Sequence, residues 1–170
     1  MNSILVALFS VLIFMGSGPN LNNGEGGDLN WVSYTDGVKQ ASAENKKILV
    51  DVYTDWCGWC KKMESDTYSD ENIKEYLTEK YILVKLNAES DARETVHDGE
   101  ATDAQLAHAF GVNGYPTTVF LGPDGTFITK ATGYMKPAEF LQALKYVGDD
   151  YYTKMGFQEY LNSQVEGSAQ

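Results

Sequence analysis

The sequence predicts a single α/β domain, and three observations indicate that class. The chain has 170 residues, of which 43% are hydrophobic and 22% charged, enough for one domain with a hydrophobic core. Apolar runs typical of strands alternate along it with segments of helical periodicity. The runs at 48–53 and 81–87 are nearly continuous in apolar residues, which is typical of strands buried on both faces.

The first half of the domain reads as helix, strand, helix and strand. A weak apolar face within 33–47, behind possible caps at Ser33 or Thr35, predicts a helix. The apolar run at 48–53 then predicts a buried central strand that leads directly into a pair of cysteines. Ser69 is expected to cap the next helix, which precedes the strand at 81–87.

The second half continues the alternation. Residues 102–112 predict a short helix, 117–121 a strand, and the turn sequence GPDG that follows predicts an antiparallel return strand over 126–131. The helix predicted over 136–147 has Pro137 in its first turn, where the missing N–H is tolerated.

Segments at both ends are expected to differ from this domain. The apolar run at 4–15, followed by small residues, predicts an export signal, either cleaved or retained as a signal anchor. We divide the chain into a signal peptide or signal anchor (1–18), a Gly- and Asn-rich flexible linker (19–30), the domain (31–148) and a C-terminal helical extension (149–170). The aromatic residues of the extension predict a short helix packed on the domain, with docking to a partner as the alternative.

Net charge narrows the classes of partner. The formal charge is −11, from 24 acidic and 13 basic residues, which repels nucleic-acid phosphates and anionic lipids. We therefore expect no nucleic-acid partner, and membrane contact only through an uncleaved N-terminal segment. The acidic stretch 88–103 is expected to be a solvated surface loop.

Both cysteines of the chain lie within the sequence DWCGWCKK, residues 55–62. Cys57 falls where the strand gives way to a helix, and the unpaired N–H groups of a helix N-terminus stabilise a thiolate. Cys60 follows one helical turn later and can attack a mixed disulfide formed on Cys57. The pattern thus predicts electron transfer through a reversible disulfide.

Other uses of the pair are weighed against this one. A structural zinc site needs four ligands, and only His97 and His108 are available besides the cysteines, at unsuitable spacing. Covalent haem attachment requires a histidine where Lys61 stands. We predict no metal and no cofactor beyond the Cys57–Cys60 disulfide.

Four separated motifs resemble those of thioredoxin-fold thiol:disulfide oxidoreductases. VDVYTDWCGWCK, VKLN, GVNGYPTTVFL and GYMKPAEFLQAL occur in the expected order over about 48–147. The resemblance implies a thioredoxin-like fold, with a central mixed β-sheet flanked by helices on both faces. It also implies a cis peptide bond before Pro116. The chain is most similar to exported thioredoxin-like domains that transfer electrons in the bacterial cell envelope.

The resemblance also assigns roles to two charged residues in the strands. Asp51 is an acid within an apolar strand, where a carboxylate is costly. By resemblance it lies beneath the disulfide and exchanges protons with Cys60, and desolvation raises its pKa. Lys85 is expected beside it. The alternatives are a strand-end carboxylate for Asp51 and a lysine extended to solvent for Lys85.

Residues around the cysteines are expected to bind substrate. Trp56 and Trp59 offer apolar surface to an extended peptide, although one of them could instead belong to the core. Gly58 permits close approach, and by resemblance Tyr115 and Pro116 complete this surface.

The predicted function is exchange of electrons between the Cys57/Cys60 pair and disulfides of exported proteins, in the reducing or interchange direction. The expected partners are disulfide-containing proteins and a protein electron donor, since no nucleotide-binding motif occurs, and the expected state is a monomer. The expected location is the periplasm or cell envelope of a bacterium. The alternatives are a dithiol oxidase and a chaperone-like binding module.

Overall fold

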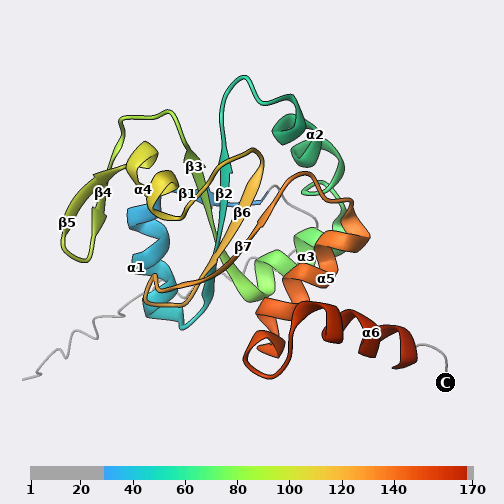
Figure 1. Ribbon diagram of the computed structural model, residues 1–170. Coiled ribbons are helices and arrows are strands. Elements are labelled where there is room, and N and C mark those ends of the chain that lie inside the picture. The colour runs from blue at the N-terminus through green and yellow to red at the C-terminus, as the bar shows by residue number, and fades with distance from the viewer. Residues whose placement is uncertain (1–28, 168–170) are drawn as a thin grey trace, which may run out of the picture.

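A five-stranded mixed sheet forms the centre of the computed structural model, which describes residues 29–167 (Figure 1). The strands are β1 (Trp31–Val32), β2 (Lys47–Tyr53), β3 (Tyr81–Asn87), β6 (Thr117–Leu121) and β7 (Phe127–Thr132). Their order is β1-β3-β2-β6-β7, in which β1, β3 and β2 are parallel, and β6 and β7 are antiparallel to their neighbours. The predicted central mixed sheet is confirmed.

Helices cover both faces of this sheet, as predicted (Figure 1). One face packs against α1 (Tyr34–Glu44) and α4 (Asp103–Ala109), and the other against α2 (Gly58–Asp66), α3 (Glu71–Lys80) and α5 (Pro137–Gly148). Side chains along β2 point alternately to the two faces of the sheet. Ile48 and Val50 pack in the core on the α1 and α4 side, and Leu49 packs in the core on the α2, α3 and α5 side. Asp51 points to the same face as Leu49, because the two lie two positions apart on the strand.

Side-chain caps determine where several helices begin, among them α1 and α3. Ser33 caps α1, with its Oγ accepting the N–H of Asp36 at 3.2 Å. The predicted cap at Ser69 is wrong: Asp70 caps α3 and accepts the N–H groups of Asn72 and Ile73. Both are good cap residues, and the Ser69 hydroxyl instead donates to a carbonyl of the preceding helix region.

Residues 88–103 contain a β-hairpin, so the prediction of a solvated loop is wrong for this segment. Strands β4 (Arg93–Val96) and β5 (Gly99–Thr102) pair only with each other, and the two-residue turn between them is followed by Gly99 with φ +138°. Most of the hairpin is exposed, which explains its polar composition, but the side chain of Glu94 is buried.

Glu94 attaches the hairpin to α1. Its Oε2 accepts hydrogen bonds from the backbone N and the Oγ1 of Thr35, at 2.8 and 2.5 Å. The Thr35 hydroxyl oxygen in turn accepts the N–H of Thr95 at 2.7 Å. Thr35 lies in the first turn of α1, where amide groups lack partners within the helix and the helix dipole favours a carboxylate.

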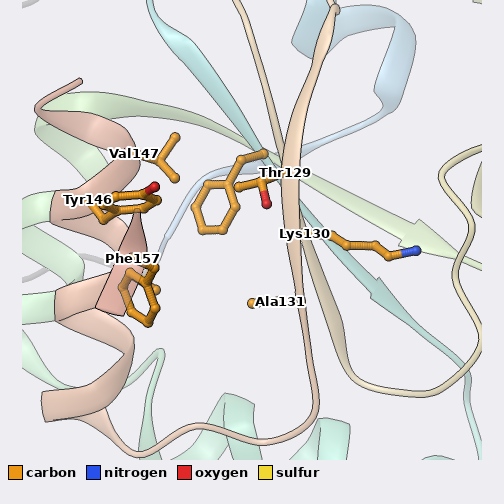
Figure 2. A pocket seen from close by; sticks show the side chains of 8 residues that line it. Thr129, Lys130, Ala131, Tyr146, Val147 and Phe157 are labelled. Carbon is orange, nitrogen blue, oxygen red and sulfur yellow. The ribbon is translucent and has the colours of Figure 1, made fainter. Parts of the chain in front are cut away.

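The C-terminal region packs on the sheet's helical layer. After a short 3-10 turn (Tyr151–Thr153), α6 (Phe157–Gly167) places the buried Tyr160 against Tyr146 of α5, at a ring distance of 5.5 Å. Figure 2 shows a mainly apolar pocket between β7, α5 and Phe157, with Lys130 pointing away from it. Lys130 donates instead to carbonyl oxygens at the end of α4, those of Phe110 and Gly111.

The predicted signal segment (1–18) and most of the predicted linker (19–30) lie outside the described residues. Over residues 29–167, no helix combines the length and the apolar character needed to cross a bilayer.

Replacement of Glu94 tests how the hairpin is held. Glu94→Ala removes the acceptor for Thr35 and leaves a partly buried amide at the helix N-terminus unpaired, so we expect a loss of about 1–2 kcal/mol in the free energy of unfolding. Urea denaturation followed by circular dichroism measures it. Glu100→Ala, on the exposed strand of the same hairpin, should change stability by less than about 0.5 kcal/mol. Equal losses in the two variants would argue against the buried contact.

Candidate active site

The two cysteines form a disulfide at the start of α2. Cys57 is the N-cap residue of this helix, and its Sγ accepts the N–H of Cys60 at 3.1 Å. A turn with a hydrogen bond from Cys57 N to Thr54 O, at 3.1 Å, connects the end of β2 to this position. Cys57 and Cys60 are only 4% and 8% exposed, so a helix N-terminus and low solvent access act on the same sulfur atoms.

The loop before β6 contains the cis peptide bond that the resemblance implied, between Tyr115 and Pro116. The carbonyl of Pro116 accepts the N–H of Gly133 at 2.8 Å, and the Thr117 hydroxyl donates to Gly114 O at 2.8 Å. These bonds fix the loop at the end of the sheet. The ring of Tyr115 lies 6.0 Å from that of Trp56, edge to face, which brings this loop beside the cysteine motif.

Two exposed tryptophans flank the disulfide. Trp56 and Trp59 are 66% and 59% exposed, so neither belongs to the core. The indole N–H of Trp56 donates to the carboxylate of Glu89, at 2.9 and 3.0 Å from its two oxygens, and Trp59 contacts the ring of Tyr134 at 5.5 Å. A Cβ added to Gly58 would meet nothing within 4 Å, so the surface between the tryptophans is open.

Sequence reasoning missed Glu89 and Tyr134 as members of this rim. Glu89 comes from the segment before the hairpin, and Tyr134 from the loop between β7 and α5. Tyr134 also donates to Asp66, which forms an ion pair with Lys62 at 2.5 Å. No local pattern marks either residue, because their contacts are made across the fold.

Asp51 and Lys85 lie side by side, as expected from the resemblance. They are register partners on β2 and β3, and Lys85 Nζ lies 2.7 Å from Asp51 Oδ2. The Asp51 side chain is 3% exposed and that of Lys85 25%, so the lysine reaches solvent while the carboxylate does not. The predicted placement of Asp51 within the sheet is therefore observed.

Several groups act on the pKa of Asp51. Burial raises this pKa above its usual value, while the charge and hydrogen bond of Lys85, and the hydroxyl of Tyr68, oppose the rise. The carboxylate of Glu64, 3.9 Å from Lys85 Nζ, raises it further by repulsion. The net direction is upward, which moves the carboxyl group toward the pH range where it can exchange protons with a thiol.

The two histidines weighed for a zinc site lie on different elements. His97 lies at the hairpin turn with a side chain that is 99% exposed, and His108 lies on α4. Within the described part of the chain, no three side chains of His, Cys, Asp or Glu come together in a way that could hold a metal ion.

The family model of the thioredoxin-like domain matches residues 34–148, which include the disulfide, Asp51, Lys85 and Pro116. The chain belongs to this family. The fold, the family match and the Cys57–Cys60 pair together identify a thioredoxin-like thiol:disulfide oxidoreductase.

Curated relatives and solved structures agree with this family. The chain is 36% identical over 107 residues to the thiol:disulfide interchange protein DsbD of Yersinia pestis (strain Pestoides F). The matched residues are 62% of this chain and 16% of that protein. It is 30% identical over 140 residues, 79% of its length, to DsbD of Colwellia psychrerythraea, of which it covers 22%. The chain thus spans less than a quarter of these relatives' length. A thioredoxin from Thermus thermophilus has the same fold, with a TM-score of 0.60, 24% identity and coverage of 71% of this chain and 87% of the other.

Separate replacement of the two cysteines tests the order in which they react. Cys57→Ser should abolish disulfide exchange, whereas Cys60→Ser should trap a mixed disulfide with substrate, because we expect the sulfur at the helix N-cap to attack and the second one to resolve. Non-reducing electrophoresis and mass spectrometry detect the trapped species. Trapping by Cys57→Ser instead, or equal alkylation of both thiols in the folded reduced protein, would reverse or remove the assignment.

Proposed function

We propose that this thioredoxin-like domain reduces or rearranges disulfides of exported proteins. The observation that favours it most is the Cys57–Cys60 disulfide at the N-terminus of α2, between two exposed tryptophans. The similarity to thiol:disulfide interchange proteins supports the type of reaction. The reducing direction, the substrates and the partners are part of the proposal.

The reaction needs no cofactor other than the cysteine pair. The Cys57 thiolate attacks a substrate disulfide, which forms a mixed disulfide and releases one substrate thiolate. The Cys60 thiolate then attacks Cys57 Sγ, which forms the Cys57–Cys60 disulfide and releases the second substrate thiolate. Two electrons pass to the substrate, and a protein electron donor restores the dithiol.

Asp51 acts in this scheme as the acceptor of the Cys60 proton. Only the thiolate of Cys60 attacks the mixed disulfide, so the proton must leave before or during resolution. A carboxylate that is buried on the α2 face of the sheet and has a raised pKa suits this step. Lys85 keeps the carboxylate ionised and oriented through the bond to Oδ2.

The substrate surface consists of the rim around the disulfide. Aromatic faces come from Trp56, Trp59 and Tyr115. Gly58 leaves open space beside Cys57, and Pro116 comes directly before the first residue of β6. Such a surface suits an extended, apolar segment of an unfolded or flexible protein. The hydrogen bond from Trp56 to Glu89 holds the indole ring of Trp56 in place before substrate binds.

The charges near Cys57 favour the reducing direction. A strong oxidant owes its potential to a reduced form in which nearby positive charge stabilises the thiolate. Gly58 and Trp59 supply no cation between the cysteines. The nearby Lys61 and Lys62 are exposed, so solvent screens their charges, and Lys62 is also paired with Asp66. The helix N-terminus remains as the main stabilising feature, which gives a moderately stable thiolate.

The N-terminal apolar run at 4–15, which predicts export, supports a location outside the cytoplasm. An oxidising compartment such as the periplasm generates unwanted disulfides and requires a supply of electrons from a protein donor. We propose that the domain acts there as a monomer on disulfide-containing proteins.

Replacement of Asp51 tests the proton transfer. Asp51→Asn should slow release of the mixed disulfide at neutral pH by roughly 10- to 100-fold while initial attack changes little, because only resolution needs the base. Stopped-flow fluorescence of Trp56 and Trp59 separates the two phases. Asp55→Asn removes the same charge from an exposed position and should leave resolution nearly unchanged. Equal slowing of both phases would contradict the assignment.

The raised pKa of Asp51 also predicts a pH dependence of stability. A carboxyl whose pKa is higher in the folded than in the unfolded chain favours folding below the unfolded pKa, and this contribution is lost as pH rises through the folded pKa. Asp51→Asn lacks this loss, so its stability relative to the native protein should increase with pH across that window. Urea denaturation at a series of pH values measures the difference. A constant difference would indicate that the pKa is not raised.

The reduction potential tests the direction. We expect about −270 to −200 mV, nearer to thioredoxin than to the roughly −120 mV of a strong oxidant, with a Cys57 pKa of about 6–8. Equilibration with glutathione or with dithiothreitol gives the potential, and thiolate absorbance gives the pKa. A pKa below about 5 together with a potential above about −150 mV would identify a dithiol oxidase instead.

A further inference from the structure

Three buried oxygen atoms around the central strand β2 have unused hydrogen-bonding capacity. They are Asp51 Oδ1, Tyr68 Oη and Thr118 Oγ1, and none of them has a hydrogen-bond partner among residues 29–167. Buried polar atoms are almost always paired, because an unpaired one costs about 1–3 kcal/mol. Three such atoms in one region therefore call for a common explanation.

These atoms belong to one cluster on the α2 face of the sheet. Asp51 of β2 and Thr118 of β6 are register partners, so their side chains emerge side by side on the same face. Tyr68, which is 4% exposed, follows α2, and its ring is fixed by edge contacts with Trp31 and Phe140 at 5.1 and 5.5 Å. The hydroxyl of Tyr68 acts on Asp51, whose pKa it lowers, and it is itself acted on by Thr118.

Lys85 forms a hydrogen bond with only one of the two carboxylate oxygens of Asp51. Its ammonium group binds Oδ2 and lies 4.8, 5.2 and 5.7 Å from the ring centres of Trp31, Tyr53 and Tyr68. The aromatic faces hold the cation beside Oδ2. Oδ1 is left for a second donor. The hydroxyls of Tyr68 and Thr118 are both buried without an acceptor in the described chain, and that of Tyr68 is the one that lowers the pKa of Asp51.

We propose that Tyr68 is a positioning residue for the exchange reaction. Its hydroxyl donates a hydrogen bond to Asp51 Oδ1, and the Thr118 hydroxyl donates one to Tyr68 Oη. These two hydrogen bonds set the pH at which Asp51 accepts the proton of Cys60. This proposal rests on the proposed function for the role of Asp51. Donation to a carboxylate stabilises its ionised form, and a second hydroxyl behind the first strengthens the donor.

The other groups that face Asp51 act alongside this pair. Lys85 from β3 favours the ionised carboxylate, while Glu64 from α2 and burial oppose it. The phenol of Tyr53, on the same strand, has a pKa raised by burial and by nearby carboxylates, so it stays neutral. Without Tyr68, the balance shifts toward protonated Asp51, and resolution by Cys60 then requires a higher pH.

The test measures the titration of Asp51 itself. The reduced full-length protein is labelled with ¹³C at aspartate carboxyl carbons, and the Asp51 signal is assigned by its absence in Asp51→Asn. Tyr68→Phe keeps the ring and removes the hydroxyl, and we expect the titration midpoint to rise by about one pH unit, a tenfold change in proton affinity. Tyr81→Phe, which removes a buried hydroxyl bonded to Leu144 O, should leave the midpoint unchanged. An unchanged midpoint in folded Tyr68→Phe overturns the proposal.

A second variant serves if Tyr68→Phe does not fold. Thr118→Val has nearly the same shape and should raise the midpoint in the same direction by a smaller amount, whereas no rise overturns the proposal. The titration needs no substrate, so it is independent of the proposed function. A raised midpoint without a matching upward shift in the pH profile of mixed-disulfide release would leave Tyr68 as a partner of Asp51 and overturn the role of Asp51 in resolution.

Discussion

The burial of one carboxylate constrains most of the site. Asp51 lies within the central strand of a sheet covered on both faces, where an ionised group costs several kcal/mol unless it is paired and hydrogen-bonded. The neighbouring strands supply Lys85 and Thr118 in register with it. Aromatic rings from β1, β2 and the segment after α2 surround the ammonium. The packing of this end of the sheet is therefore arranged around a charge pair, and the disulfide lies at the start of the adjacent helix.

Features that depend on local sequence could be predicted. The continuous apolar runs of β2 and β3 identify them as central strands, because only strands buried on both faces lack alternation. The cysteine pair directly after β2 locates the reactive sulfur at a helix N-cap. The pairing of Asp51 with Lys85 came from family resemblance, since no spacing rule indicates which residues of separate strands become partners.

Features that depend on contacts across the fold could not be predicted. The strands of the hairpin are short, polar and mostly exposed, so they lack the apolar alternation that marks a strand. What makes the segment a hairpin is the pairing of β4 with β5 and the burial of Glu94, and neither can be read from the local sequence. Tyr68 and Tyr134 are aromatic residues in connecting segments, where sequence alone does not distinguish core from site. The choice of Asp70 over Ser69 as cap depended on chain geometry, because both side chains can accept the same bonds.

The hydrogen bond between Trp56 and Glu89 attaches the rim of the site to a different part of the chain from the one that carries the disulfide. Glu89 belongs to the connection that leads from β3 into the hairpin, whereas the cysteines and Asp51 belong to β2 and α2. A connecting segment on the surface tolerates changes in length and composition better than a buried strand does. Variation in this connection can therefore reshape the aromatic rim beside the disulfide, while Cys57, Cys60 and Asp51 stay as they are.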